Sequence, residues 1–203
     1  MRSILLLGVV VSVVIAFAIG RLSAQESPAS CRMCPSTYIP ASEIAEFTAL
    51  GRADLSLLDQ QMRAIDIGKS QVEVALVHRG KLDKVGARSV AEHDLVSEVY
   101  YVLSGSGTNR TGPDLVDQKR RPATDRAVRL LNGPGGDAAD IRNAAEHELK
   151  AGDVLVIPAG TGHQFTKIDD HITYLVVRVD PDKVVPLMDE AASQAYRAAH
   201  RRK

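Results

Sequence analysis

The sequence predicts an all-β fold, a sandwich or barrel of short strands with a helix before it and another after it. Short apolar segments rich in β-branched residues recur between turns that contain Gly and Asp, and no helical pattern separates them. From Gln71 onward the residues alternate, with Val72, Val74 and Leu76 on one face, as in a half-buried strand. Further strands are expected over 89–93, 98–104, 154–157, 162–167 and 172–179.

The two helices are expected at the ends of this strand-rich region. Residues 41–51 combine a Ser near the start, apolar residues at helical spacing and a terminal Gly. Residues 185–203 are Ala-rich and compatible with a helix that packs on the outside of the domain or extends a dimer contact. Residues 55–62 are ambiguous.

Between residues 109 and 148 the sequence becomes polar, irregular and rich in Gly and Pro, which predicts one long loop. Such a loop is either a lid over a binding site or a surface insertion without a role, and the segment 127–131 could form a strand inside it. The predicted organisation is a signal peptide (1–24), a linker and helix (25–61), a barrel (62–180) and a helical tail (181–203).

The composition fits a single globular domain and argues against a nucleic-acid partner. The chain has 203 residues, enough for one globular domain with its own core, and 25 basic residues balance 25 acidic ones. Because the basic residues are scattered, apart from the short tail Arg201 to Lys203, we expect no nucleic-acid surface.

The N-terminus predicts export. Met1 and Arg2 precede an apolar run from Ile4 to Ile19, and small residues follow up to Ala24, as in a signal peptide cleaved near that residue. The protein is therefore expected to be periplasmic or secreted, with no membrane association beyond this segment. An uncleaved N-terminal anchor is the alternative.

The only two cysteines, Cys31 and Cys34, follow this segment. A local disulfide or an ordinary pair of thiols is favoured over redox catalysis, because the surrounding sequence is rich in Ser and Pro and predicts no strand leading into a helix.

One segment couples a strand and a turn to a single imidazole. Gly152, Pro158 and Gly160 bracket a short apolar run and deliver His163 beyond it. Together with His93, Glu98 and Gly105 upstream, this pattern resembles the two paired motifs of the cupin family, whose fold is a jelly-roll barrel or double-stranded β-helix. The sequence departs from the motifs at Ala91, where the family has its first His, at Lys167, where it has Asn, and at the opening Gly of the first motif.

The resemblance implies one divalent metal ion held by His93, Glu98 and His163. Two His and one carboxylate favour Fe(II), with Mn, Ni, Zn or Cu as alternatives. It also implies a homodimer and an enzyme, a dioxygenase, lyase or isomerase, that acts on a small polar organic molecule. Tyr100 shares the inward face of Glu98 and is the candidate acid or base. The alternative is a non-catalytic barrel that binds a sugar or another small ligand, with a degenerate metal site.

Other residues near the motifs have simpler expected roles. His78 is either a substitute fourth ligand or a histidine of the core or rim, and Phe165 is expected to pack in the barrel. Glu92 and Asp94 are expected to face solvent, because neighbours on a strand point to opposite faces, and His171 to lie on the surface.

Overall fold

The computed structural model describes residues 35–201. The predicted signal peptide, Cys31 and Cys34 and the last two residues lie outside the described residues. In the described part of the chain, no helix is long and apolar enough to cross a membrane.

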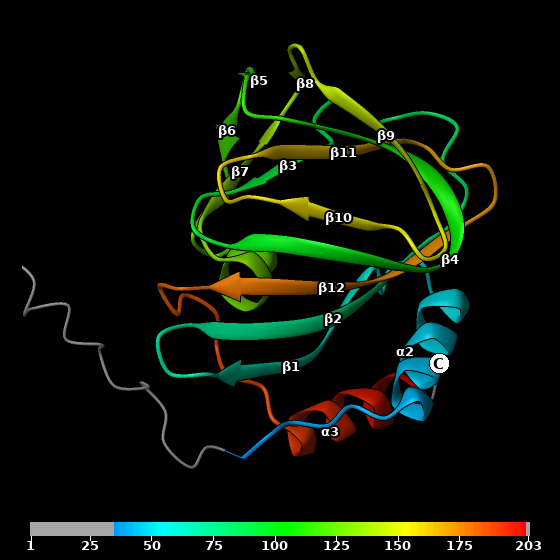
Figure 1. Ribbon diagram of the computed structural model, residues 1–203, viewed down its shortest axis with the longest axis vertical. Helices are drawn as coiled ribbons and strands as arrows, with labels where there is room; N and C mark the ends of the chain where they lie inside the picture. Colours follow the sequence, from blue (N-terminus) through cyan, green and yellow to red (C-terminus); the bar gives the residue numbers. More distant parts are fainter. Residues whose placement is uncertain (1–34, 202–203) are drawn as a thin grey trace, which may run out of the picture. The chain divides into compact units, whose positions relative to one another are not determined.

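Figure 1 shows the strands of the protein stacked above two helices, α2 and α3. The helices are α2 (Ala41–Ala53), the π-helical turn η1 (Val128–Asn132) and α3 (Glu190–His200). The strands are β1 (Asp59–Asp66), β2 (Gln71–Arg79), β3 (Val90–His93), β4 (Ser97–Gly112), β5 (Leu115–Val116), β6 (Lys119–Arg120), β7 (Gly135–Ala138), β8 (Asp140–Ile141), β9 (Ala145–Lys150), β10 (Val154–Ile157), β11 (Gly162–Lys167) and β12 (Ile172–Asp180).

Strand β4 links the two halves of an antiparallel jelly-roll barrel. Its first half pairs with β12 and β10, and its second half pairs with β9 and β11. The change of partner occurs at Gly105, where φ is +75° and a Cβ atom would overlap the carbonyl of His171. Only glycine adopts this conformation readily, so the strand expected over 98–104 continues through a bend at Gly105 as one strand.

The prediction of one long loop over 109–148 is wrong. This segment contains the end of β4, the short strands β5 to β8 and most of β9. These strands are polar, glycine-rich or only two residues long, so they lack the apolar alternation by which a strand is recognised. In β9 only Leu149 is buried. The strand considered for 127–131 is also wrong, because residues 128–131 form most of η1 and Ala127 caps it.

The barrel core consists of inward-facing residues of the predicted strands. Ala75 and Val77 of β2 pack with Tyr100 of β4, with Tyr174 of β12 and with Phe165 of β11. Phe165 therefore packs as expected. The ambiguous segment 55–62 contributes the start of β1 at Asp59.

Helices α2 and α3 cover the outer face of β1 and β2. Phe47 of α2 packs on Met62 and Leu76, and its ring stacks on Tyr196 of α3 with centroids 5.8 Å apart. The two helices therefore pack on the outside of the barrel, which leaves its interior open for a site.

Candidate metal centre

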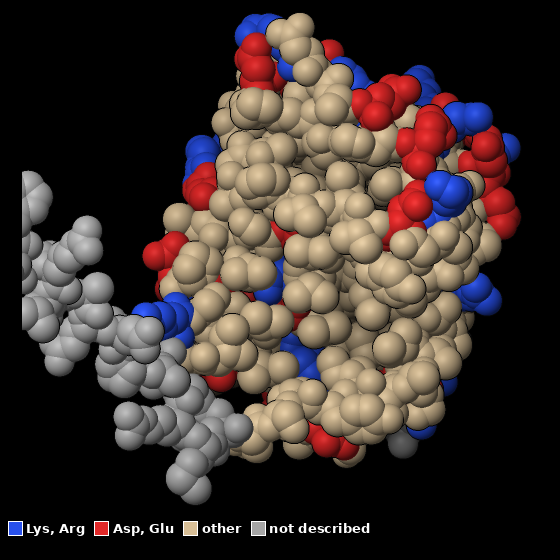
Figure 2. All heavy atoms as spheres, in the orientation of Figure 1, with Lys and Arg blue, Asp and Glu red and all other residues tan. Residues whose placement is uncertain are grey.

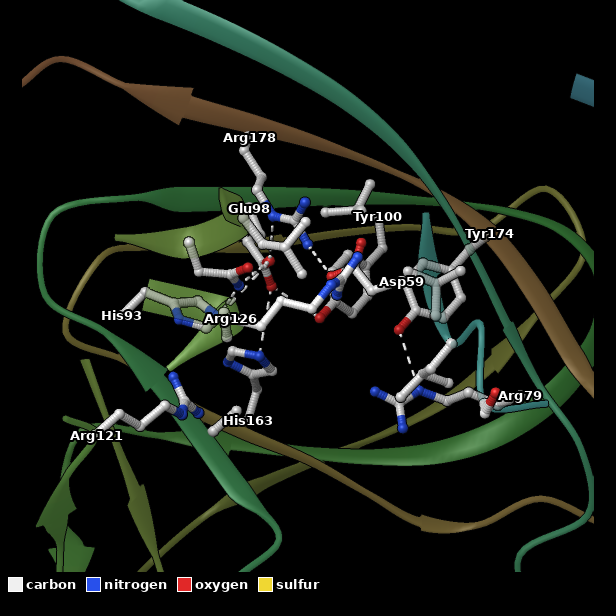
Figure 3. Close-up of a pocket in the computed structure, with 18 residues that line it drawn as sticks. Asp59, Arg79, His93, Glu98, Tyr100, Arg121, Arg126, His163, Tyr174 and Arg178 are labelled. Carbon is white, nitrogen blue, oxygen red and sulfur yellow. Dashed lines mark hydrogen bonds and ion pairs between the residues drawn. The ribbon is translucent and has the colours of Figure 1, made fainter. Parts of the chain in front are cut away.

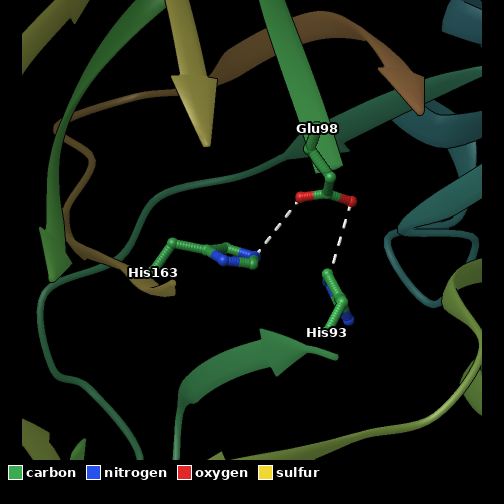
Figure 4. A group of neighbouring side chains, drawn as sticks. All are labelled: His93, Glu98 and His163. Atoms are coloured by element: carbon green, nitrogen blue, oxygen red, sulfur yellow. Dashed lines mark ion pairs between the residues drawn. The ribbon is translucent and has the colours of Figure 1, made fainter. Parts of the chain in front are cut away.

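The barrel brings the two sequence motifs together. His93 ends β3, Glu98 lies at the start of β4 and His163 lies on β11, and all three are buried. Figure 4 shows the two imidazoles directed at the carboxylate. The Nε2 atom of His93 lies 3.7 Å from Oε1 of Glu98, and Nε2 of His163 lies 3.4 Å from Oε2. One ligand atom from each residue lies within 4.8 Å of the others, so the three form a candidate metal site.

The separations within this triad fit a shared metal ion. Metal–ligand bonds of about 2.1 Å place neighbouring donor atoms about 3.0–3.5 Å apart. The two observed distances are close to that range and long for direct hydrogen bonds. In addition, Nδ1 of His163 lies 3.3 Å from the carbonyl oxygen of Thr161. A proton on Nδ1 directs the Nε2 lone pair toward Glu98, as in a ligating histidine.

The protonation states also suit metal binding. Burial lowers the pKa of His93 to about 3 and also lowers the pKa of His163, so both imidazoles are neutral at pH 7. Burial by itself would raise the pKa of Glu98. The positive charge of Arg178 and the hydrogen bond from Tyr100 counteract burial, and the pKa of Glu98 lies below its ordinary value. The triad therefore offers two neutral imidazoles and one carboxylate.

Asn132 is a fourth polar group at the triad, and no sequence motif indicates it. Its Nδ2 lies 2.7 Å from Nε2 of His93 and 3.3 Å from Oε1 of Glu98. Its Oδ1 is buried and has no hydrogen-bond partner among the described residues. Because amide N and O are assigned from hydrogen bonds, Asn132 can turn either atom toward the triad. It stands beside the triad, which receives no donor from Ala91.

Two buried side chains hold the carboxylate of Glu98 in place. Tyr100 donates a 2.8 Å hydrogen bond to Oε2, and Arg178 donates a 3.0 Å hydrogen bond from Nε to Oε1. Arg178 also pairs with Asp59 of β1. Burial raises the pKa of Tyr100 well above 10, so its phenol is protonated and acts as a donor.

A cavity of about 280 Å³ opens beside the triad. Figure 3 shows Arg79, Tyr174, Asp59, Arg121 and Arg126 around it, with the triad and Tyr100. Its size suits a small molecule. Arg79 continues the inward face of β2, two residues beyond Val77, so the strand alternation in the sequence was a signal for this residue that the motifs did not use.

His78 lies outside the site. Its side chain is buried on the outer face of β2, close to Gly51 of α2, and its Nδ1 lies 2.7 Å from Oγ1 of Thr173. The alternative that His78 is a substitute fourth ligand is therefore wrong, and His78 is a core histidine.

The predicted exposure of Glu92 is also wrong. Glu92 is buried, because side chains at β6 contact it: its Oε2 accepts a 2.7 Å hydrogen bond from Gln118 and lies 4.0 Å from Nη1 of Arg120. Asp94 pairs with the exposed Arg120, and His171 is partly exposed next to Asp170.

Comparison with known proteins gives one family match and several similar structures. Residues 142–201, which include β10, β11, β12 and α3, match the AraC-like ligand binding domain. A Bacillus halodurans protein is 16% identical, with 80% of this chain and 97% of that chain covered, at a TM-score of 0.42. A Bacteroides fragilis cupin protein is 20% identical, with 58% and 72% covered and a TM-score of 0.30. An RmlC-like cupin from Methanocaldococcus jannaschii is 12% identical, with 62% and 84% covered and a TM-score of 0.35. No curated protein matches the chain.

The barrel, the two motifs that meet inside it and the family match agree with one another. The bend of β4 at Gly105 produces the jelly-roll arrangement, and His93, Glu98 and His163 occupy motif positions on β3, β4 and β11. The chain folds as a jelly-roll β-barrel in which residues that resemble the two cupin motifs meet, and its residues 142–201 match the AraC-like ligand binding domain.

Proposed function

We propose that this protein binds one divalent metal ion through His93, Glu98 and His163. We further propose that it is an enzyme, a dioxygenase, lyase or isomerase, that acts on a small polar organic molecule. The convergence of two neutral imidazoles and one carboxylate beside a cavity carries the proposal. The donor set favours Fe(II), with Mn, Ni, Zn and Cu as alternatives.

In this proposal the bound ion and the side chains around it have different roles. A divalent ion bound at the triad would supply Lewis acidity or, as Fe(II), redox chemistry. Arg178 holds the carboxylate of Glu98, and the carbonyl of Thr161 orients His163. Tyr100 reaches both Glu98 and the cavity, so its hydroxyl can orient a substrate and exchange a proton with it.

Elemental analysis of protein purified without added metal tests this proposal. We expect about one metal ion per chain in the wild type and loss of that metal in His163→Ala and Glu98→Gln. The matched control is His147→Ala, which removes a partly exposed imidazole of β9 that takes no part in the triad. A wild-type chain that neither contains metal nor binds added Fe, Mn, Ni, Zn or Cu would contradict the proposal. Turnover of small polar molecules, screened with and without oxygen, then separates the reaction classes.

A non-catalytic barrel that binds a sugar or another small ligand is the second candidate. Two observations favour it: the family match to a ligand binding domain, and the fact that Tyr100 and Arg178 already satisfy Glu98. A thermal-shift screen of metal-free protein with sugars and small metabolites tests it. Stabilisation of the wild type and of His163→Ala by the same ligand, without turnover, would favour binding over catalysis.

We also propose that the protein is exported, on the basis of residues 1–24. N-terminal sequencing of the protein from cell fractions tests this. A chain that begins near Gln25 in the periplasm or medium supports cleavage, and a full-length chain in the membrane fraction supports the uncleaved anchor.

The expected homodimer has a candidate interface on the outer face of the barrel. Tyr101 of β4 and Val154 and Val156 of β10 are apolar and exposed there, and the register places Tyr101 beside Val154. Figure 2 shows a largely uncharged face with charged side chains gathered at its margins. Light scattering of the wild type and of Val156→Lys tests the proposal, and a dimer that becomes a monomer in the variant supports it.

A further inference from the structure

The cavity beside the triad carries surplus positive charge. Two acids, Asp59 and Glu98, and four arginines, Arg79, Arg121, Arg126 and Arg178, line it. Both acids pair with Arg178, and Arg121 pairs with Asp137 outside the cavity. Within residues 35–201, Arg79 and the exposed Arg126 are the lining arginines without an ion-pair partner. A cavity of this charge favours an anionic ligand.

Arg79 is held at one edge only. Its Nε donates a 3.3 Å hydrogen bond to the hydroxyl of Tyr174, and its guanidinium lies 5.2 Å from the centre of the Phe165 ring. In the described part of the chain, its two terminal nitrogens have no hydrogen-bond partner. Figure 3 shows Arg79 and Tyr174 together on one side of the triad. A partly buried cation that is oriented but unpaired matches a planar carboxylate, which a guanidinium binds through two parallel hydrogen bonds.

Ala91 leaves room between Arg79 and the triad. It is the register partner of His163. A second cavity, of about 140 Å³, lies next to the first, and the residues that line both are Arg79, Ala91 and His163. An imidazole at position 91 would fill space where the two cavities adjoin, whereas the alanine side chain leaves that space to a ligand.

We propose that the site binds a small organic acid whose carboxylate pairs with Arg79 while a second polar group of the same molecule faces His93, Glu98 and His163. The volume of about 280 Å³ limits the ligand to a small molecule. The inference rests on the proposed function only for the polar group that faces the triad, because the ion pair between the carboxylate and Arg79 needs no metal.

Calorimetric titration of the purified protein tests the proposal. The probes are acetate, lactate, malonate, succinate and malate, each compared with its neutral amide. We expect at least one acid to bind the wild type and its amide not to bind. Loss of a charge-assisted pair in Arg79→Gln should weaken binding roughly tenfold to a hundredfold. Arg129→Gln, which removes an exposed arginine that does not line the cavity, is the matched control and should bind as the wild type does.

The conservative variants Arg79→Lys and Tyr174→Phe keep the test decisive if Arg79→Gln does not fold. Lysine retains the positive charge but cannot donate the two parallel hydrogen bonds of a guanidinium. Phenylalanine at position 174 removes the oxygen that orients Arg79. Each variant should therefore weaken binding by less than Arg79→Gln. If no acid binds the wild type, or if all folded variants bind as tightly as the wild type, the proposal is overturned.

Metal analysis of the same samples separates the two proposals. A chain that binds an acid through Arg79 but holds no metal contradicts the proposed function and supports the anion site. A chain that holds metal through the triad, and whose binding of acids is the same in Arg79→Gln, contradicts the anion site alone.

Discussion

Arg178 on β12 and Glu98 on β4 are register partners, and Nε of Arg178 donates a 3.0 Å hydrogen bond to Oε1 of Glu98. On the other side of β12, the register partner of Arg178 is Glu73 of β2. A row of two acidic side chains with a guanidinium between them therefore crosses three neighbouring strands, and all three side chains are buried. This row positions Glu98 at the triad through a protein contact that does not depend on a metal.

Loss of Arg178 should destabilise the fold strongly. Arg178→Met leaves the buried Glu98 and the partly buried Asp59 without their cation, and removal of one partner of a buried pair costs about 3–5 kcal/mol. Urea unfolding at pH 7 measures the loss. Arg120→Met breaks an exposed pair with Asp94 and should cost about 1 kcal/mol or less. Equal losses in the two variants would contradict this role for Arg178.

Glu73 should make the stability fall as pH rises. Burial raises the pKa of its carboxyl from 4.5 to about 8, so between these values the folded chain holds a proton that the unfolded chain releases. The contribution of Glu73 to the free energy of unfolding is therefore greatest below pH 4.5 and decreases up to about pH 8. Glu73→Gln should match the wild type near pH 4.5 and exceed its stability at pH 8, by roughly 5 kcal/mol at most.

Urea unfolding of both proteins from pH 4.5 to pH 8.5 measures this difference. Neither oxygen of Glu73 has a hydrogen-bond partner among the described residues, so glutamine carries a similar desolvation cost and the comparison isolates the charge. Parallel pH profiles for the two proteins would show that Glu73 is ionised in the fold, contrary to the expectation.

A histidine at position 91 should strengthen metal binding. Ala91 is the register partner of His163 and lines the cavity, so Ala91→His directs a further imidazole toward the triad. An added ligand should lower the Kd for Zn²⁺ by about tenfold or more, measured by competition with a chelator. Ala127→His, at another position on the cavity wall, is the control and should leave the Kd near its wild-type value. The Ala91 variant should also bind organic acids more weakly, because the imidazole fills space next to Arg79.

Tyr100 and its neighbour Tyr101 provide a matched pair of variants. Tyr100→Phe removes the hydroxyl that donates to Glu98 and should cost about 1 kcal/mol of stability while the metal content is retained. Tyr101 faces outward and is 46% exposed, so Tyr101→Phe should leave both quantities unchanged. If Tyr100 exchanges a proton with substrate, its variant should also lose about 10²-fold to 10⁴-fold in turnover. Loss of metal in Tyr100→Phe would instead indicate that the phenol keeps Glu98 in its ligating position.

His163 and the strands with an apolar face illustrate what local sequence can predict. The Gly and Pro residues around β10 and the turn before β11 specify a strand and a turn by their own backbone preferences, and His163 follows at a set position. Strands β2, β10, β11 and β12 carry an apolar face, so their bounds agree with the expectation to within about a residue. In contrast, β5 to β9 are short or lack apolar alternation, so the sequence contains no local signal for them.

The amino-acid sequence by itself determined the strand-rich fold and the three motif residues His93, Glu98 and His163, because both follow from short-range patterns of apolar residues, turns and motif spacing. Only the tertiary structure decided which other side chains complete the site. Asn132, Arg178 and Arg79 come from segments far apart in the chain, and their proximity to the triad depends on strand register and on the closure of the barrel. Their roles arise from long-range packing, which leaves no local pattern in the sequence.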